Sequence, residues 1–411
     1  PLKEQVFIPT KEYFGGLFGV FGDSLPDGWG NLLLNRMLRK KGMKPEKMTM
    51  LNRLAIVGQS GMGALTYRPE EHFSFEPQGY DLDDLALQCR DLGYKVKMLY
   101  GDKEFVGVEK WLGKDYSDLP HANIEKDAVP LSVSDVLFIP EINANVMVAI
   151  KNKKEALCKK VAILTSMRYL SDIMRPIGTT WDNLEINECI TMTEALAENI
   201  KSVFPSVRTH VVRPRINKVF TYDASKPKPL VINIISKTSE HANSIVNNLH
   251  WKYKTYGFLA IRELKGLPFE EQAKALQDSF LTIWLDTDTE FGLEALEAMA
   301  CGSIVAGKIP ENVPEWMIDE KGELKDNGIW FTKNSDIQDV IASAVQTYLY
   351  DKMPEVLYEE MEKTVKAYDS SVSEESVKKT IDDDIIGNRV KEFELLISGI
   401  KNNKDKETET E

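Results

Sequence analysis

Two glutamates stand on either side of a Phe-Gly pair in the stretch 282–314. Glu290 directly precedes Phe291 and Gly292, and Glu297 follows within the next two helical turns. A carboxylate accepts hydrogen bonds from a sugar diol, and the start of a helix offers unpaired N–H groups to phosphate. Glycine lets the backbone approach such a ligand closely. These residue types favour the binding of a phosphate-bearing ligand.

The flanking residues predict the elements that position these side chains. The apolar run 281–285 predicts a strand, the apolar residues from Leu293 onward recur at helical spacing, and 304–306 predicts a second strand. Gly302 suits the end of the helix. A strand, a helix and a strand in succession form a βαβ unit of a parallel sheet. Ligands of such sheets bind at the carboxyl ends of the strands, which places the site at 288–292.

Residues 290–302 (EFGLEALEAMACG) resemble the donor-binding signature of retaining GT-B glycosyltransferases of the family 4 type. The resemblance implies that Glu297 binds the ribose of a nucleotide and that Glu290 lies near the transferred sugar as the catalytic residue. It also implies that the neighbouring residues contact sugar and phosphate, namely Phe291, Gly292 and Leu293. Residues 310–315 resemble the next donor-side loop of the family.

The signature departs from the family pattern at its first glutamate. That glutamate should fall at Thr289, one place before Glu290. Either Glu290 takes its role through a local shift, or the position has lost its role. On an isolated amphipathic helix Glu294 and Glu297 would be two solvated charges. The strand–helix–strand context favours the ligand-binding interpretation.

The first 90 residues form a separate block, predicted as a small α+β segment. The apolar patch 51–57 predicts a helix there. Residues 18–36 and 57–69 resemble the N-terminal region of HipA-type toxin kinases, a non-catalytic cap that contacts an antitoxin. The resemblance implies a protein partner for residues 1–90. It implies no kinase activity, because no glycine-rich loop with a following lysine and no HRD-like or DFG-like motif is found.

From residue 91 onward, strands alternate with helices, which is typical of a Rossmann-like domain. The expected strands are 93–100, 135–140, 161–165, 189–193 and 210–213, and the expected helices are 144–160 and 194–204. The series resembles the acceptor-side domain of a GT-B enzyme, here 91–225. Its first strand is predicted to be missing, since the HipA-like block occupies that place. The junction near 88–93 therefore resembles a fusion.

A Pro-Lys linker at 226–229 precedes the predicted donor domain, 229–368. Lys237 follows its first strand and is a candidate for binding the donor diphosphate, the alternative being a flexible surface lysine. Lys252 and Lys254 are the other nearby cations. A C-terminal helix is predicted within 369–400, and the apolar-free tail 401–411 is predicted to be disordered. The further elements expected in the donor domain are strands at 230–235, 256–261 and 328–331 and helices at 269–278 and 337–350.

Composition excludes several classes of function. The net charge of −13 over 411 residues argues against general nucleic-acid binding. Four separated cysteines without a Cys-x-x-Cys pair, no zinc-ligand spacing, no secretory signal and no apolar run of about 18 residues predict a cytoplasmic protein without a membrane span.

The sequence thus predicts an α/β protein with two Rossmann-like domains in the GT-B arrangement. The predicted function is transfer of a sugar from a nucleotide-sugar donor to an unknown acceptor with retention, without a metal or other cofactor. The alternatives are a degenerate glycosyltransferase that binds without turnover, a HipA-like protein-interaction module, and a toxin kinase, which the lack of kinase motifs disfavours.

Overall fold

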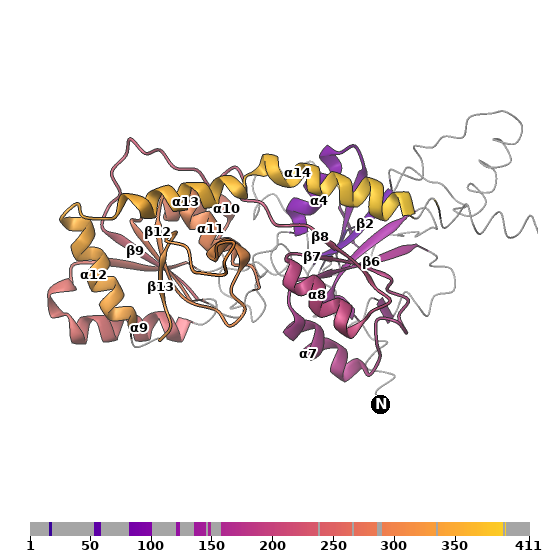
Figure 1. Cartoon of the computed structure of the whole chain (residues 1–411), viewed down its shortest axis with the longest axis horizontal. Helices are drawn as coiled ribbons and strands as arrows, with labels where there is room; N and C mark the ends of the chain where they lie inside the picture. The colour runs from indigo at the N-terminus through magenta and orange to yellow at the C-terminus, as the bar shows by residue number, and fades with distance from the viewer. Residues whose placement is uncertain are drawn as a thin grey trace, which may run out of the picture.

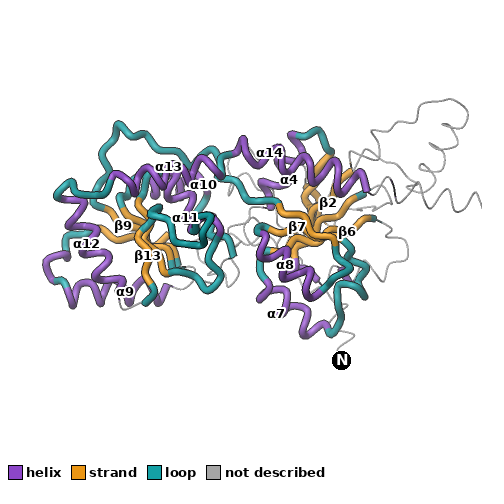
Figure 2. Tube along the Cα trace, viewed as in Figure 1, coloured by secondary structure: helices purple, strands orange, loops and turns teal. Residues whose placement is uncertain are grey.

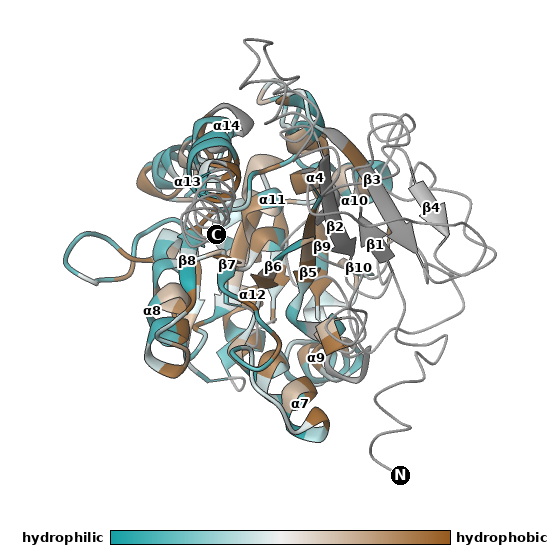
Figure 3. Cartoon of the chain, turned by 90° about the vertical axis from the view of Figure 1, so that its right-hand side faces the viewer, coloured by the Kyte–Doolittle hydropathy of each residue, from teal (hydrophilic) through white to brown (hydrophobic). Residues whose placement is uncertain are grey.

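The computed structural model describes two lobes, each built on a β-sheet with helices on both sides (Figure 1). The described residues are 16–18, 53–58, 82–100, 121–123, 135–144, 147–148, 158–236, 239–264, 267–285, 290–333, 336–388 and 391. The prediction of disorder for 401–411 lies outside these ranges. Hydrophobic residues gather on the strands and on the helix faces turned toward them (Figure 3).

The first sheet has eight strands in the order β4-β3-β1-β2-β5-β6-β7-β8. The strands are β1 (Gly16–Phe18), β2 (Arg53–Gly58), β3 (Lys95–Tyr100), β4 (His121–Asn123), β5 (Val136–Pro140), β6 (Lys159–Leu164), β7 (Glu188–Thr191) and β8 (Arg208–Val211). All the pairings are parallel except those of β1, which runs antiparallel to β2 and β3. Strands β5 and β6 are buried along their whole length, which explains their nearly continuous apolar sequence.

Strand β2 corrects two predictions. The patch 51–57 was predicted to be helical, and the first strand of this sheet was predicted to be missing. In the structure, β2 pairs in parallel with β3 (Ile56 opposite Met98) and with β5 (Ile56 opposite Phe138). It occupies the first-strand position of a Rossmann-like order. A short apolar run fits a strand or a helix equally well, and here long-range pairing decides between them.

The helices of the first lobe are α4 (Leu82–Asp91), α7 (Met167–Ile177) and α8 (Glu194–Val203). The predicted N-cap of α8 is confirmed: the Thr193 hydroxyl accepts a hydrogen bond from the Leu196 amide at 3.2 Å. Ser166 caps α7 in the same way. The helix predicted at 144–160 is wrong at its end, because Lys159 already begins β6. Most of its remaining residues lie outside the described ranges.

The second sheet is entirely parallel, in the order β10-β9-β11-β12-β13. Its strands are β9 (Val231–Ile235), β10 (Ala260–Leu264), β11 (Leu281–Trp284), β12 (Ile304–Lys308) and β13 (Ile329–Phe331). Its helices are α9 (Ser239–Lys252), α10 (Phe269–Gln277), α11 (Leu293–Ala300), α12 (Ile337–Leu349) and α13 (Glu355–Ala367). The two predicted Rossmann-like sheets are confirmed. The strand predicted at 256–261 begins later, because Lys254–Tyr256 form a 3-10 turn.

The chain returns from the second lobe to the first through its C-terminal helices (Figures 1 and 2). After α13, Tyr368 marks the crossing, and α14 (Ser370–Lys378) with the wide-turned segment Lys379–Ile386 continues along the first lobe. Helix α14 contacts α4. Buried Val377, Ile381 and Ile385 fix this segment by their apolar side chains. A C-terminal helix was predicted within 369–400, and α14 lies in the first part of this range.

Candidate active site

The strand order of the second sheet reverses between β9 and β11, so their carboxyl ends form the switch point where such sheets bind ligands. Helix α11 is the element that follows β11 in the chain, with Gly292 as its N-cap residue, so it begins on the side of these carboxyl ends. Gly292 has a φ of 76°, and a Cβ there would lie 2.6 Å from the Trp284 ring. The glycine is therefore required by the backbone turn and by Trp284, which the sequence alone did not reveal.

Two of the residues predicted to bind the donor have buried side chains. Phe291 is fully buried and packs edge-on against Tyr368, with ring centroids 5.5 Å apart. Its carbonyl accepts a hydrogen bond from the Trp316 indole at 2.5 Å. Leu293 is also buried. These side chains hold the start of α11 in place, which leaves the backbone as the group that a ligand could contact.

Glu297 is not a solvated charge, since its exposed fraction is only 4%. Its Oε2 accepts a hydrogen bond from the Gln272 amide of α10 at 2.9 Å. Burial, and after it the Glu297 charge, raise the pKa of Cys301 at the far end of α11 to about 12. A carboxylate held inside a domain beside the switch point is suited to accept further hydrogen bonds.

Glu290 lies between the two lobes. Its Oε2 accepts a hydrogen bond from the Asn312 amide of the same lobe at 3.0 Å. Burial raises the pKa of Glu290, while hydrogen bonds from Asn312 and from the Met167 backbone lower it. Met167 is the first residue of α7, in the other lobe. The carboxylate thus meets groups of both lobes.

The predicted cations differ in what the structure describes. Lys237 lies outside the described residues, as does Thr289, the position where the family pattern has its first glutamate. Lys252 stands at the last residue of α9, a helix of 14 residues that begins at Ser239, close to the end of β9. A helix rises about 1.5 Å per residue, which puts Lys252 about 20 Å from the switch point. Lys252 instead pairs with Asp339 at 2.6 Å, so it is excluded as the diphosphate ligand.

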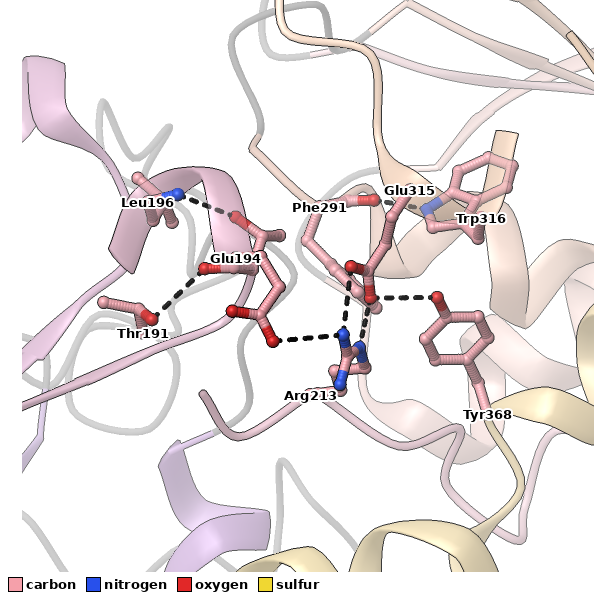
Figure 4. Close-up of polar contacts among 9 residues, drawn as sticks. Thr191, Glu194, Leu196, Arg213, Phe291, Glu315, Trp316 and Tyr368 are labelled. Carbon is pink, nitrogen blue, oxygen red and sulfur yellow. Dashed lines mark hydrogen bonds and ion pairs between the residues drawn. The ribbon is translucent and has the colours of Figure 1, made fainter. Parts of the chain in front are cut away.

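An ion-pair cluster that the sequence did not predict joins the lobes next to this site (Figure 4). Arg213, just after β8, binds both carboxylate oxygens of Glu315, which follows β12. The Glu315 carboxylate also accepts a hydrogen bond from the Tyr368 hydroxyl at 3.2 Å. Hydrogen bonding to Glu315 raises the pKa of Arg213, so the guanidinium stays charged. The sequence signals were the place of Arg213 at the carboxyl end of a strand and the place of Glu315 in the stretch 310–315, which resembles a donor-side loop.

A second unpredicted group is Glu141, at the carboxyl end of β5. It is completely buried, and its Oε1 accepts hydrogen bonds from the backbone amides of Thr165 and Ser166, each at 3.0 Å, and from the Thr165 hydroxyl. Burial raises the pKa of Glu141 from 4.5 to about 7, although these hydrogen bonds lower it. Glu141 therefore fixes the loop that leads into α7.

Two features are absent from the parts of the chain that the structure describes. Among these residues, no helix is long and apolar enough to cross a bilayer. Within the same ranges, no cluster of three or more His, Cys, Asp or Glu side chains is arranged to hold a metal ion.

Comparison with known proteins supports the N-terminal resemblance. Residues 1–68 match the family model described as the HipA N-terminal domain. This match covers only the start of the chain. No curated protein matches the sequence.

Solved structures similar to this chain include several sugar transferases, all at low identity. The pneumococcal O-GlcNAc transferase GtfA, in complex with UDP and GlcNAc, is 12% identical, with 62% of this chain and 57% of that chain covered and a TM-score of 0.44. A variant of S. aureus TarM is 15% identical, with 61% and 55% covered and a TM-score of 0.46. Sucrose-phosphate synthase from Thermosynechococcus elongatus is 13% identical, with 77% and 92% covered and a TM-score of 0.43. The chain thus spans little more than half the length of GtfA and TarM.

Proposed function

We propose that the second lobe binds a nucleotide sugar at the switch point of its sheet and that the two lobes together transfer the sugar to an acceptor with retention. The observation that carries the proposal is Glu297, a buried carboxylate one helical turn inside a helix whose N-terminus lies at the switch point. Ribose hydroxyls would donate to Glu297, and the α11 N-terminus with Gly292 would receive phosphate. Lys237 is assigned to the diphosphate.

In this reaction the bond from the anomeric carbon to the diphosphate oxygen breaks. A bond to the acceptor oxygen forms on the same face of the sugar, and the acceptor proton passes to the departing diphosphate. The negative charge that develops on the diphosphate is stabilised by backbone N–H groups and a lysine, so the step needs no metal. Glu290, which accepts a hydrogen bond from Asn312, is assigned to hydrogen-bond the sugar being transferred.

The first experiment offers the purified chain a panel of UDP-, ADP- and GDP-sugars and measures nucleotide diphosphate release. Titration calorimetry then compares the binding of the active nucleotide to wild type and to Glu297→Gln, which keeps the volume and removes the charge. A hydrogen bond to a charged group contributes roughly 1.5–3 kcal/mol, so affinity should fall about 10- to 100-fold.

Glu271→Gln is the matched control, since Glu271 is an exposed carboxylate on α10, one residue from the Gln272 that binds Glu297. It should bind the nucleotide like the wild type. Equal affinity of Glu297→Gln and wild type would remove the ribose role.

A second candidate function is protein binding by the N-terminal block, favoured by the HipA N-terminal match at residues 1–68. The sugar panel separates the two. Nucleotide binding without release of nucleotide diphosphate would favour a degenerate transferase. No binding of any sugar nucleotide would leave the interaction module as the remaining proposal.

A further inference from the structure

Arg213, Glu315 and Tyr368 form a three-residue contact, here called the Arg213 clamp (Figure 4). The guanidinium binds Glu315 with two nitrogens: Nε contacts Oε1, and Nη2 lies 3.2 Å from Oε2. Such two-point pairs fix the relative orientation of both planes, which a lysine cannot do. Nη2 also lies 3.7 Å from the Glu194 carboxylate at the start of α8. The clamp therefore fixes an angle between the lobes as well as a distance.

Both sides of the clamp are held by well-packed backbone. On the first lobe, Val212, the neighbour of Arg213, is buried and its amide binds the Thr191 carbonyl at 2.9 Å. On the second lobe, Trp316, the neighbour of Glu315, is buried and its indole binds the Phe291 carbonyl. A shift of either lobe is thus transmitted to the clamp instead of being absorbed by loose loops.

Tyr368 adds a third connection, because it stands at the crossing between α13 and α14. Its backbone carbonyl accepts a hydrogen bond from the Ile216 amide of the first lobe at 2.9 Å. Its hydroxyl donates to Glu315 of the second lobe. Its ring packs on Phe291, next to Glu290. The crossing point of the chain therefore contacts both lobes and the clamp.

The loop that carries Glu315 also carries Asn312, whose amide holds Glu290. On the other side, the backbone of Met167 in the first lobe is near enough to lower the pKa of Glu290. Glu290 is thus held by Asn312 of its own lobe and faces the other lobe, and the clamp sets how those lobes meet. By contrast, Glu297 and its partner Gln272 lie within the second lobe alone.

We propose that Arg213 is a cross-lobe positioning residue: by binding Glu315 it sets the loop of Asn312 so that Glu290 is in place when the two lobes close. The assignment of Glu290 to the sugar rests on the function proposed above. The inference predicts a split between binding and turnover. Nucleotide affinity depends on the second lobe and is retained without the clamp, whereas turnover depends on the meeting of both lobes and is lost.

The experiment compares wild type with Arg213→Met, the conservative Arg213→Lys and the exchanged pair Arg213→Glu with Glu315→Arg. Arg175→Met, an exposed arginine on α7, is the control for loss of one positive charge. Two readouts do not need activity: hydrogen exchange of residues 309–317, and the radius of gyration from small-angle scattering. Two more test the proposed function: the nucleotide dissociation constant measures binding, and kcat measures turnover.

Arg213→Met should speed exchange in 309–317 and enlarge the radius of gyration. It should lower kcat by up to about 5-fold, as expected for the loss of a partly exposed ion pair, while the nucleotide dissociation constant changes less than about 2-fold. Arg213→Lys should fall between, and the exchanged pair should recover part of the loss. Unchanged exchange and scattering in Arg213→Met would overturn the clamp, even in a chain that turned over no sugar nucleotide. A parallel loss of nucleotide affinity and kcat would overturn the positioning role.

Discussion

Replacing Glu141 with glutamine should change how the stability of the chain depends on pH. Glu141 is completely buried, and burial raises its pKa from 4.5 to about 7. In the window between these values the folded state holds a proton that the unfolded state has released. Stability from this group is therefore largest below about pH 4.5, falls as pH rises toward about 7, and is constant above that. Glutamine does not titrate and removes this slope.

The magnitude follows from the two pKa values. The gap between 4.5 and about 7 corresponds to about 3 kcal/mol in total. Between about pH 5 and about pH 8, which avoids acid unfolding, roughly 2.5 kcal/mol of it should appear. Glutamine keeps an oxygen for the Thr165 and Ser166 amides, so the loop before α7 should stay in place. Glu141→Gln should thus gain stability relative to wild type as pH rises.

The assay is urea unfolding of both proteins across this pH range, followed by far-ultraviolet circular dichroism. The quantity of interest is the difference in unfolding free energy, because all other titrating groups cancel in it. Glu198→Gln, on the exposed face of α8, controls for the loss of one negative charge. A difference between Glu141→Gln and wild type that stays flat within about 0.5 kcal/mol from pH 5 to 8 would refute the raised pKa and the dry environment that causes it.

Two further predictions concern the second lobe. Lys228→Met should lower the free energy of unfolding in urea by roughly 2–3 kcal/mol, because the Lys228 ammonium donates hydrogen bonds to the Leu276, Gln277 and Cys301 carbonyls that end α10 and α11. Lys226→Met, a surface control, should lower it by less than about 1 kcal/mol. Equal losses in the two variants would contradict the capping role. Gly292→Ala should destabilise the fold more than Gly322→Ala, because both glycines have positive φ but only a Cβ at Gly292 would meet the Trp284 ring. The difference in unfolding free energy should be about 1–3 kcal/mol by thermal unfolding. Equal destabilisation by the two substitutions would refute the close contact.

Most elements of the second lobe could be predicted, because their signals are local, but helix α9 was not predicted and β10 begins later than predicted. Short apolar runs gave its strands, and apolar spacing gave α10 within one residue of its end. Gly302 was predicted to end α11. It does so with a φ of 71°, and its amide donates a hydrogen bond to the Met299 carbonyl. Each of these features is decided within about ten residues, which one sequence contains.

The first lobe depended more on distant contacts. The run Arg53–Gly58 is apolar enough for a strand or a helix, and its pairing with β3 and β5 involves residues about 40 and 80 positions away. Helix α7 was not predicted, although Ser166 is an N-cap residue and its buried Leu170 and Met174 are four residues apart. Long-range pairing of this kind leaves no trace in local periodicity.

The site was predicted in its residue types but not in its environments. Glu294 and Glu297 are three residues apart on α11, a spacing that favours one exposed face, yet Glu297 is buried. The cause is that α10 and α13 both contact α11, which leaves little of its surface open. Arg213 and Glu315 are 102 residues apart, so neither residue signals the other in the sequence.

The energies of these contacts decide how the two lobes are held together. The C-terminal segment joins them permanently, since its Val377, Ile381 and Ile385 are buried in the core. The Arg213 clamp is different, because the Arg213 side chain is 42% exposed and that of Glu315 is 27% exposed. Ion pairs that are this exposed to solvent contribute about 1 kcal/mol or less to the stability of the contact they form. A ligand that binds the closed arrangement of the lobes a few kcal/mol more tightly than an open one can therefore shift the balance between the two toward the closed arrangement. A strong tether with a weak clamp suits a site that must open for a substrate and close around it.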